Sequence, residues 1–131
     1  MLLRGGEAVT ALTAMRIMEA GGPVAARVEK VDADHLAAAI GAEYFEIYHR
    51  RVGPLMRDYL VICDDAGRIK SRTPTAVTAD GTVAFVGDIL VCRERCHDIA
   101  SIDEEDAAYL HTSLVECEWD GKTLIALEVD R

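Results

Sequence analysis

Aromatic residues are scarce in this chain of 131 residues: they make up 5% of it, with a single tryptophan. A buried core must therefore consist mainly of valine, isoleucine, leucine and alanine. Proteins that bind single-stranded nucleic acid need flat aromatic faces on which successive bases stack. The composition weighs against that class of protein.

Long apolar runs are also missing. A membrane-spanning helix needs about 18 or more consecutive apolar residues, and no stretch of this sequence approaches that length. The first residues, Met1–Gly6, lack the apolar run of a secretory signal. We therefore expect a cytoplasmic protein with no membrane partner. Its four cysteines are expected to be reduced thiols, because disulfides persist mainly in oxidising compartments.

Basic residues are outnumbered, 14 against 23 acidic ones, which gives a formal net charge of −9. The imbalance is uneven along the chain. Residues 50–95 carry eight basic and six acidic side chains, whereas residues 96–131 carry two basic and ten acidic ones. Nucleic acid and anionic membranes repel such an acidic end, so neither is expected as a direct partner. Solubility is the simplest role for this charge.

Half of the residues are apolar, which is enough for one core at this length. We expect residues 1–14 to form an N-terminal arm and residues 15–131 to form a single domain. Alternating or β-branched runs between turn residues predict strands. These strands are expected at 15–20, 24–31, 44–48, 59–63, 68–70, 82–86, 89–92, 117–119 and 122–127.

Turn residues join several of these strands. Gly21–Pro23 is expected to close a first hairpin, and Asp120-Gly121 is the preferred pair for a type I′ turn in the last one. The strand at 44–48 should point Phe45 and Ile47 inward. Residues Thr73–Thr75 are expected to form a loop.

Two helices are predicted. The first covers His35–Ile40, with an N-cap in Asp32–Asp34 and Gly41 at its end. The second begins with a capping box, in which Ser101 is the N-cap and Glu104 bonds back to it. Its apolar face is expected to contain Ala107, Leu110 and Leu114. Short strands, tight turns and two helices predict an α+β fold, a mostly antiparallel sheet with two helices packed against one face.

Several segments resemble a family of small proteins from bacteriophages, plasmids and conjugative elements, known as domain of unknown function 3846. The resemblance is carried by His35–Gly41, Tyr44–Tyr48, Tyr59–Gly67, Phe85–Val91 and Asp98–Glu105, and it spans about residues 15–114. Ser71–Thr75 departs from the family pattern by keeping a single proline. The resemblance implies a mobile-element setting and no established activity, so no catalytic residue is carried over.

Two local clusters are candidate sites. Cys92, Cys96 and His97 have a spacing compatible with zinc, with His111 or Cys117 to complete a tetrahedron. The alternative, which we favour, makes Cys92 a small buried side chain at a strand end and leaves Cys96 and His97 in a loop. No metal or other cofactor is therefore expected.

The second cluster is basic. Arg68, Lys70 and Arg72 alternate along a predicted edge strand and so share one face. Together with Arg51 in the preceding loop, and with Arg50 and Arg57 beside it, they would bind a nucleotide or another anionic ligand. The alternative is that these cations protect an exposed sheet edge from pairing with other chains.

The sequence favours a non-catalytic binding or regulatory module of a phage or mobile element, whose partner is a host or phage protein or a small anionic ligand. Two alternatives stay open. The carboxylates of residues 98–106 and 116–130 would let the protein imitate nucleic acid and inhibit a host defence protein. A small nucleotide-binding protein or enzyme would instead use the basic edge. No catalytic residue is assigned.

Overall fold

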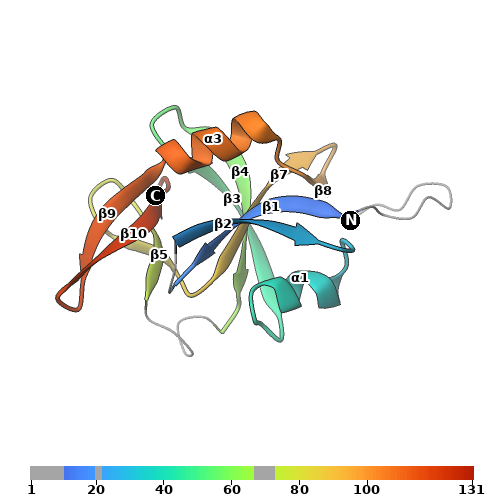
Figure 1. Cartoon of the computed structure of the whole chain (residues 1–131), viewed down its shortest axis with the longest axis horizontal. Helices are drawn as coiled ribbons and strands as arrows, with labels where there is room; N and C mark the ends of the chain where they lie inside the picture. The colour runs from blue at the N-terminus through green and yellow to red at the C-terminus, as the bar shows by residue number, and fades with distance from the viewer. Residues whose placement is uncertain (1–10, 20–21, 67–72) are drawn as a thin grey trace, which may run out of the picture.

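The computed structural model describes residues 11–19, 22–66 and 73–131, which form an α+β fold of two sheets and two helices (Figure 1). Sheet A is antiparallel and has the order β2 (Gly22–Val28), β1 (Leu12–Met18), β7 (Ile89–Arg95), β4 (Arg57–Asp64) and β3 (Phe45–Val52), with β8 (Asp98–Ala100) paired to β7. Sheet B has the order β6 (Val83–Val86), β5 (Pro74–Val77), β10 (Lys122–Glu128) and β9 (Leu114–Trp119). The helices are α1 (Ala33–Ala39) and α3 (Glu104–Thr112).

The two faces of sheet A bury separate apolar clusters. On one face, side chains such as Val61 of β4 pack with Leu110 of α3 and Leu127 of sheet B. On the other face, Ile62 of β4 packs with Leu36 of α1. Figure 1 shows α3 and α1 on opposite sides of the strands of sheet A. The predicted α+β class, a mostly antiparallel sheet with two helices packed against it, is confirmed. The expectation that only one face is covered is wrong, because α3 and sheet B pack on one face of sheet A and α1 packs on the other.

Several local predictions are confirmed. Strands β1 and β2 pair as an antiparallel hairpin. Asp32 caps α1, since its carboxylate accepts a hydrogen bond from the His35 backbone N–H at 2.8 Å. The inner strand β4 buries Tyr59–Cys63. The β9–β10 turn has positive φ at both Asp120 and Gly121, as a type I′ turn requires.

The start of α3 lies two residues beyond its predicted position. Asp103 is the N-cap, and it forms a capping box with Asp106 instead of the predicted pair Ser101 and Glu104. The Ser101 hydroxyl accepts a hydrogen bond from the Thr13 backbone N–H at 2.9 Å, which ties the preceding loop to β1. Since Ser101 is occupied there, a carboxylate further along the acidic run caps the helix.

Sheet B accounts for two further corrections. Residues Pro74–Val77, which overlap the predicted loop at Thr73–Thr75, form the fully buried strand β5. Proline is tolerated there because it is the first residue of the strand. Strand β5 pairs with β10 in parallel, a pairing between distant segments that no local pattern indicated. In sheet A, Ile47 lies on the same face of β3 as Phe45, but it is 40% exposed, so its predicted burial is wrong.

The predicted boundary of the arm also shifts. Strand β1 begins at Leu12, and both Leu12 and Ala14 are buried, so residues 12–14 belong to the sheet. Residues 1–10 and 20–21 and the predicted edge strand 68–70 lie outside the described residues. Gly22 and Pro23, which the sequence predicts in the first turn, are the first residues of β2. Of the helices in the described segments, neither is long and apolar enough to cross a membrane.

Candidate functional site

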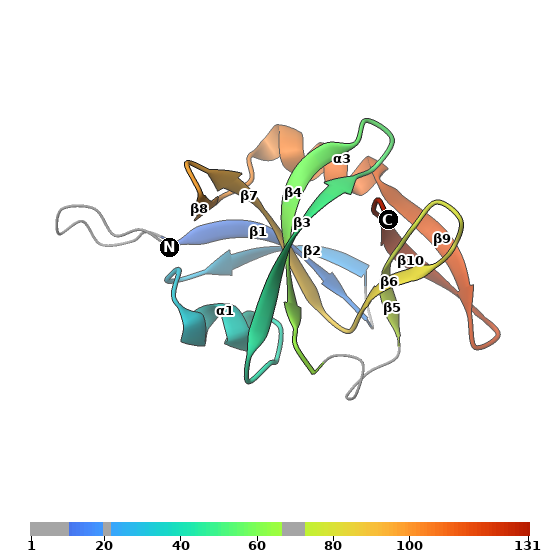
Figure 2. The ribbon, with the colours of Figure 1, turned by 180° about the vertical axis from the view of Figure 1, so that it is seen from behind.

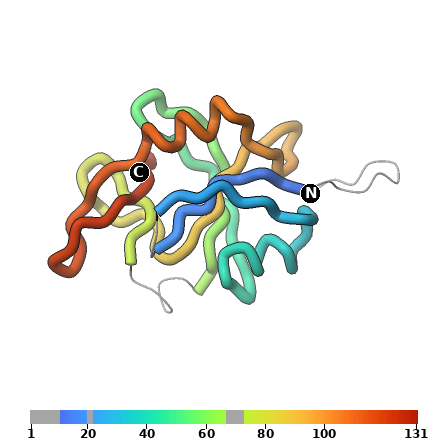
Figure 3. The backbone as a smooth tube through the Cα atoms, in the orientation of Figure 1, coloured from blue at the N-terminus to red at the C-terminus, as the bar shows by residue number. Residues whose placement is uncertain are grey.

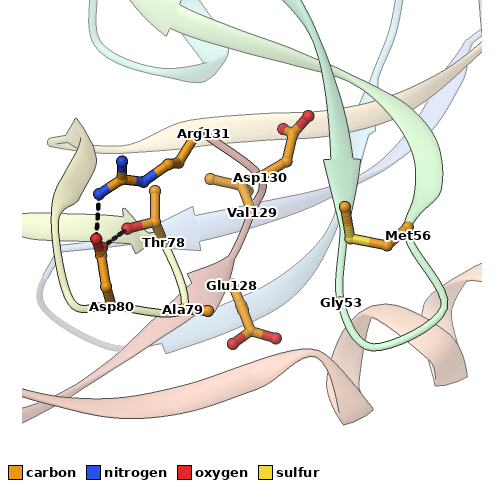
Figure 4. A pocket seen from close by; sticks show the side chains of 9 residues that line it. All are labelled: Gly53, Met56, Thr78, Ala79, Asp80, Glu128, Val129, Asp130 and Arg131. Atoms are coloured by element: carbon orange, nitrogen blue, oxygen red, sulfur yellow. Dashed lines mark hydrogen bonds and ion pairs between the residues drawn. The ribbon is translucent and has the colours of Figure 1, made fainter.

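A hollow of about 280 Å³ lies where three distant segments of the chain meet, and we call it the apolar hollow. Its walls are the turn between β3 and β4, the turn between β5 and β6, and the residues at the end of β10. The backbone trace in Figure 3 shows the C-terminal end of the chain between these two turns. The lining residues are Gly53, Met56, Thr78, Ala79, Asp80, Glu128, Val129, Asp130 and Arg131 (Figure 4).

The β3–β4 turn, Gly53–Met56, is held by hydrogen bonds at each end, and we call it the docking turn. The Gly53 N–H donates to the Glu128 carbonyl at 3.0 Å, and the Met56 N–H donates to the Gly53 carbonyl at 3.1 Å. The Leu55 N–H donates to the Tyr109 hydroxyl at 3.0 Å. Figure 2 shows this turn beside α3, the helix that contains Tyr109. The turn is therefore fixed to both β10 and α3.

Gly53 is required at the start of the docking turn. Its backbone φ angle is +73°, a value that residues with a Cβ rarely adopt. A Cβ added at this position would lie 2.0 Å from the Ser113 hydroxyl oxygen. No other residue allows the turn to lie this close to the end of α3. The sequence predicted a chain break at Gly53-Pro54 but not this contact.

The docking turn exposes two large apolar side chains. Leu55 is 65% exposed and Met56 is 49% exposed. Met56 also has a φ of +53°, a left-handed conformation that is uncommon for residues other than glycine. A braced backbone thus presents two apolar groups to solvent, and one of them forms a wall of the apolar hollow.

The opposite wall is the turn Thr78–Thr82. Its Asp80 carboxylate accepts hydrogen bonds from the Thr78 hydroxyl and from the Thr82 N–H, and it forms an ion pair with Arg131 across the hollow (Figure 4). These hydrogen bonds, chiefly the one from Thr78, lower the pKa of Asp80, so the group is ionised at neutral pH. Asp80, Glu128 and Asp130 outnumber Arg131 in the lining, which makes the rim acidic.

On the other side of the docking turn lies a polar hollow of about 420 Å³. Its central group is the buried Asp106 carboxylate, which accepts hydrogen bonds from the Tyr59 hydroxyl at 2.8 Å, from Arg93 at 3.0 Å and from the Asp103 N–H at 3.1 Å. Burial acts to raise the pKa of Asp106, but these hydrogen bonds and the charge of Arg93 outweigh it and lower the pKa. Burial raises the pKa of Tyr59. At neutral pH this carboxylate is therefore ionised and this phenol protonated, which suits an anchor for α3 better than a proton-transfer pair.

The predicted basic site is not assembled by the residues that the structure describes. Arg50 and Arg51 lie on β3 instead of in a loop, and Arg57 begins β4. Arg50 pairs with Asp130, Arg51 lies 3.8 Å from Asp58, and Arg57 lies 3.6 Å from Glu105. Arg51 lines neither hollow.

The remaining cations of that prediction, Arg68, Lys70 and Arg72, lie outside the described residues. The anionic-ligand site therefore stays a prediction for that segment.

The cysteine cluster is also dispersed. Cys92 is buried against α1, and burial raises the pKa of its thiol to about 12. Cys96 and His97 form the exposed turn between β7 and β8. Within residues 11–19, 22–66 and 73–131, no three histidine, cysteine or acidic side chains are placed to hold a metal ion. All four cysteines are free thiols.

Sequence reasoning missed the main elements of this site. The docking turn did give a signal, because Leu55 and Met56 are large apolar residues next to Gly53-Pro54, where polar residues are usual. For the opposite wall of the apolar hollow, the sequence contained no signal beyond the Asp80-Gly81 turn, because the position of that wall depends on the pairing of β5 with β10.

No protein-family model matches this chain, no curated protein matches it, and no solved structure matches it. The resemblance to domain of unknown function 3846 depends on the sequence segments given above and stays a prediction.

Proposed function

We propose that this protein is a non-catalytic binding module that docks a protein partner through the docking turn and the apolar hollow beside it. The occupant is a segment of the partner in which one apolar side chain is flanked by lysine or arginine. The observation that carries this proposal is the exposure of Leu55 and Met56 on a turn fixed by hydrogen bonds at both ends.

The bracing of the turn favours binding. Association costs free energy whenever flexible backbone or side chains are ordered at an interface. The docking turn is ordered before any partner arrives, so that cost is reduced. Binding energy concentrates in a few central contacts surrounded by a polar rim. Met56 and the buried Val129 provide the apolar centre of the hollow, and Asp80, Glu128 and Asp130 provide its rim. Leu55 adds exposed apolar surface on the docking turn, outside the hollow.

Charge selects the partner. The rim of the apolar hollow is acidic, and the whole chain has a net charge of −9. Complementary charge accelerates encounter and disfavours partners of like charge. A basic segment with one apolar side chain meets both requirements, whereas an acidic segment would be repelled by Glu128 and by the net negative charge of the chain.

A binding role fits the polar hollow as well. Its ionisable groups bond mainly to one another, and the carboxylate and the phenol at its centre have pKa values shifted away from neutrality. A general acid or base works best with a pKa near the working pH. We propose a phage or mobile-element setting on the sequence resemblance alone, and the four free thiols fit the reducing cytoplasm expected from the sequence.

The test is a titration of the ¹⁵N-labelled full chain with a synthetic peptide in which one leucine is flanked by two arginines on each side. We expect saturable shifts of the amide signals of Gly53, Met56, Ala79 and Val129. Replacing the leucine of the peptide by alanine should weaken binding about tenfold, because an apolar side chain in a pocket contributes about 1–3 kcal/mol. The same titration should show no saturation when the four arginines are replaced by glutamates.

A matched pair of variants separates the site from general attraction between opposite charges. Met56→Ser should weaken peptide binding about tenfold, whereas Ile125→Ser, at an exposed position on β10, should leave it unchanged. Amide shifts centred on the β9–β10 hairpin, or equal binding of the leucine and alanine peptides, would contradict the proposal.

A further inference from the structure

A third hollow, of about 240 Å³, lies on the face of sheet A that α1 covers, and we call it the histidine hollow. Its elements, α1, β3 and β8, can be followed in Figure 2. Phe45, Ile47 and Leu60 contribute apolar surface to its lining, and His49, Glu94 and His97 contribute polar groups. It is therefore an apolar recess with a few polar groups converging on it, the usual form of a small-molecule site.

Two of the polar groups, His49 and Glu94, come from strands that are not neighbours in sheet A. His49 lies on the edge strand β3 and Glu94 lies on β7, with β4 between them. His49 Nε2 and Glu94 Oε1 are nevertheless 3.1 Å apart. The two side chains therefore meet over the strand that separates them, beside Leu60, which pairs directly with His49 in the sheet register.

His97 is held at this hollow by an unfavourable turn. Strands β7 and β8 are joined by two residues, Cys96 and His97, whose φ values are +52° and +66°. Such a turn strongly prefers Asn-Gly or Asp-Gly, because a left-handed conformation costs about 1–2 kcal/mol for each residue that carries a Cβ. The turn therefore reduces the stability of the hairpin.

The same chain contains a turn without this cost. The β9–β10 hairpin uses Asp120 and Gly121, with φ values of +51° and +74°, which is the preferred pair for this geometry. Backbone strain tends to persist at functional sites, where the surrounding structure maintains it. The strain at Cys96-His97 lies where His97 lines a hollow, and this points to a role for the imidazole there.

We propose that the histidine hollow binds a small free amine that carries an apolar ring, with the ring over Phe45 and Ile47 and the ammonium group at Glu94. Of the described residues that line the hollow, Glu94 is the one carboxylate, and no lysine or arginine is among them, so an ammonium group finds an acceptor and no competing amine or guanidinium there. The carboxylate offers two oxygens, and an ammonium donor can bond to it while His49 keeps its contact. His97 closes the hollow beside the ring.

This site is independent of the proposed function. The residues that line the histidine hollow share none with the apolar hollow, and the two hollows lie on different faces of sheet A. A failure of one proposal therefore leaves the other intact.

The test uses the ¹⁵N-labelled full chain at pH 7 and three probes of similar shape: 2-phenylethylamine, 2-phenylethanol and 3-phenylpropionate. We expect the amine to shift the amide signals of residues 45–49 and 94–99 in a saturable manner. The alcohol should bind at least tenfold more weakly, and the carboxylate should not saturate. Glu94→Gln should weaken amine binding about tenfold, whereas Glu116→Gln, on the distant strand β9, should not change it.

A second test changes the turn between β7 and β8 in a way that should stabilise the fold, so that weaker amine binding cannot be attributed to unfolding. The double variant Cys96→Asn, His97→Gly should raise the urea midpoint of unfolding, since it installs the preferred turn pair, and it should weaken amine binding several-fold. Equal binding of the three probes, absence of saturable amine binding, or an unchanged affinity in Glu94→Gln would overturn the proposal. Full affinity in the double variant would overturn the role of His97.

Discussion

Asp106 combines a structural task with an electrostatic one in a single side chain. It closes the capping box of α3 with Asp103, and it accepts hydrogen bonds from Tyr59 and Arg93 of sheet A. A buried carboxylate is costly unless it is fully hydrogen-bonded and paired with a cation. These partners meet both conditions, so the residue fixes the start of α3 to the sheet.

Asp106→Asn keeps the shape of this side chain and removes its charge. We expect a loss of about 2–4 kcal/mol in the free energy of unfolding at pH 7, because the Arg93 charge loses its buried partner. The folded-state pKa of Asp106 is lowered, so its stabilising contribution is present above the ordinary carboxyl pKa near 4 and is lost as the pH falls through the folded-state value. The difference between wild type and variant should therefore shrink between pH 4 and pH 2, as measured by urea unfolding.

Asp58→Asn is the matched control for this measurement. Asp58 is exposed and lies 3.8 Å from Arg51, and surface pairs of this kind contribute little. We expect a change below about 0.5 kcal/mol. A difference for Asp106→Asn that stays constant from pH 7 to pH 2 would show that folding does not lower the pKa of this carboxyl group.

At the scale of helices and strands, the sequence predicts best where a feature depends on neighbouring residues. Asp32 before α1 and Asp120-Gly121 between β9 and β10 are local signals, and both predictions are confirmed. The predicted cap at Ser101 is wrong because Ser101 bonds to Thr13, 88 positions away in the sequence. The acidic residues that follow Ser101 are also able to cap a helix. The long-range hydrogen bond from Thr13 occupies the Ser101 hydroxyl, and Asp103 is the N-cap instead.

The position of this cap can be tested directly. Asp103→Ala should lower the free energy of unfolding by about 1 kcal/mol, the usual effect of losing an N-cap. Ser101→Ala should cost less than about 0.5 kcal/mol, because the exposed Thr13 N–H can bond to water instead. Urea unfolding of the two variants measures both values. A larger loss in Ser101→Ala than in Asp103→Ala would restore the cap predicted from the sequence.

At the scale of the whole molecule, the two sheets depend on one apolar cluster. Val61 of sheet A and Leu127 of sheet B belong to the same buried group, and Val52 forms an isolated bridge with Val129 where the sheets adjoin. Neither sheet buries its apolar face without the other. The sequence predicted the strands but not their division into two sheets, because that division depends on the parallel pairing of β5 with β10.

The candidate site has the same limitation. The apolar hollow requires residues near positions 53, 80 and 130 to meet, and no spacing in the sequence links them. Two large apolar residues in a turn, Leu55 and Met56, were a local sign of a binding surface. No local pattern in the sequence indicated the hollow beside them.

A shared cluster implies one cooperative transition. Trp119, the single tryptophan of the chain, lies on β9 of sheet B, so its fluorescence reports on that sheet, whereas far-UV circular dichroism reports on all elements. We expect the two signals to give the same urea midpoint, as two-state unfolding requires. Ile125→Ser, at an exposed position, should leave the agreement intact. A tryptophan transition at lower urea would show that sheet B unfolds separately.

The parallel contact between β5 and β10 has a consequence for synthesis of the chain on the ribosome. Pro74–Val77 is made about 45 residues before Lys122–Glu128, its neighbour in sheet B. At about 5–20 residues per second, that interval is roughly 2–9 s. During those seconds the strand that is fully buried in the folded protein lacks its β10 neighbour, so the nascent polypeptide passes through a period in which chaperones or other chains can bind it.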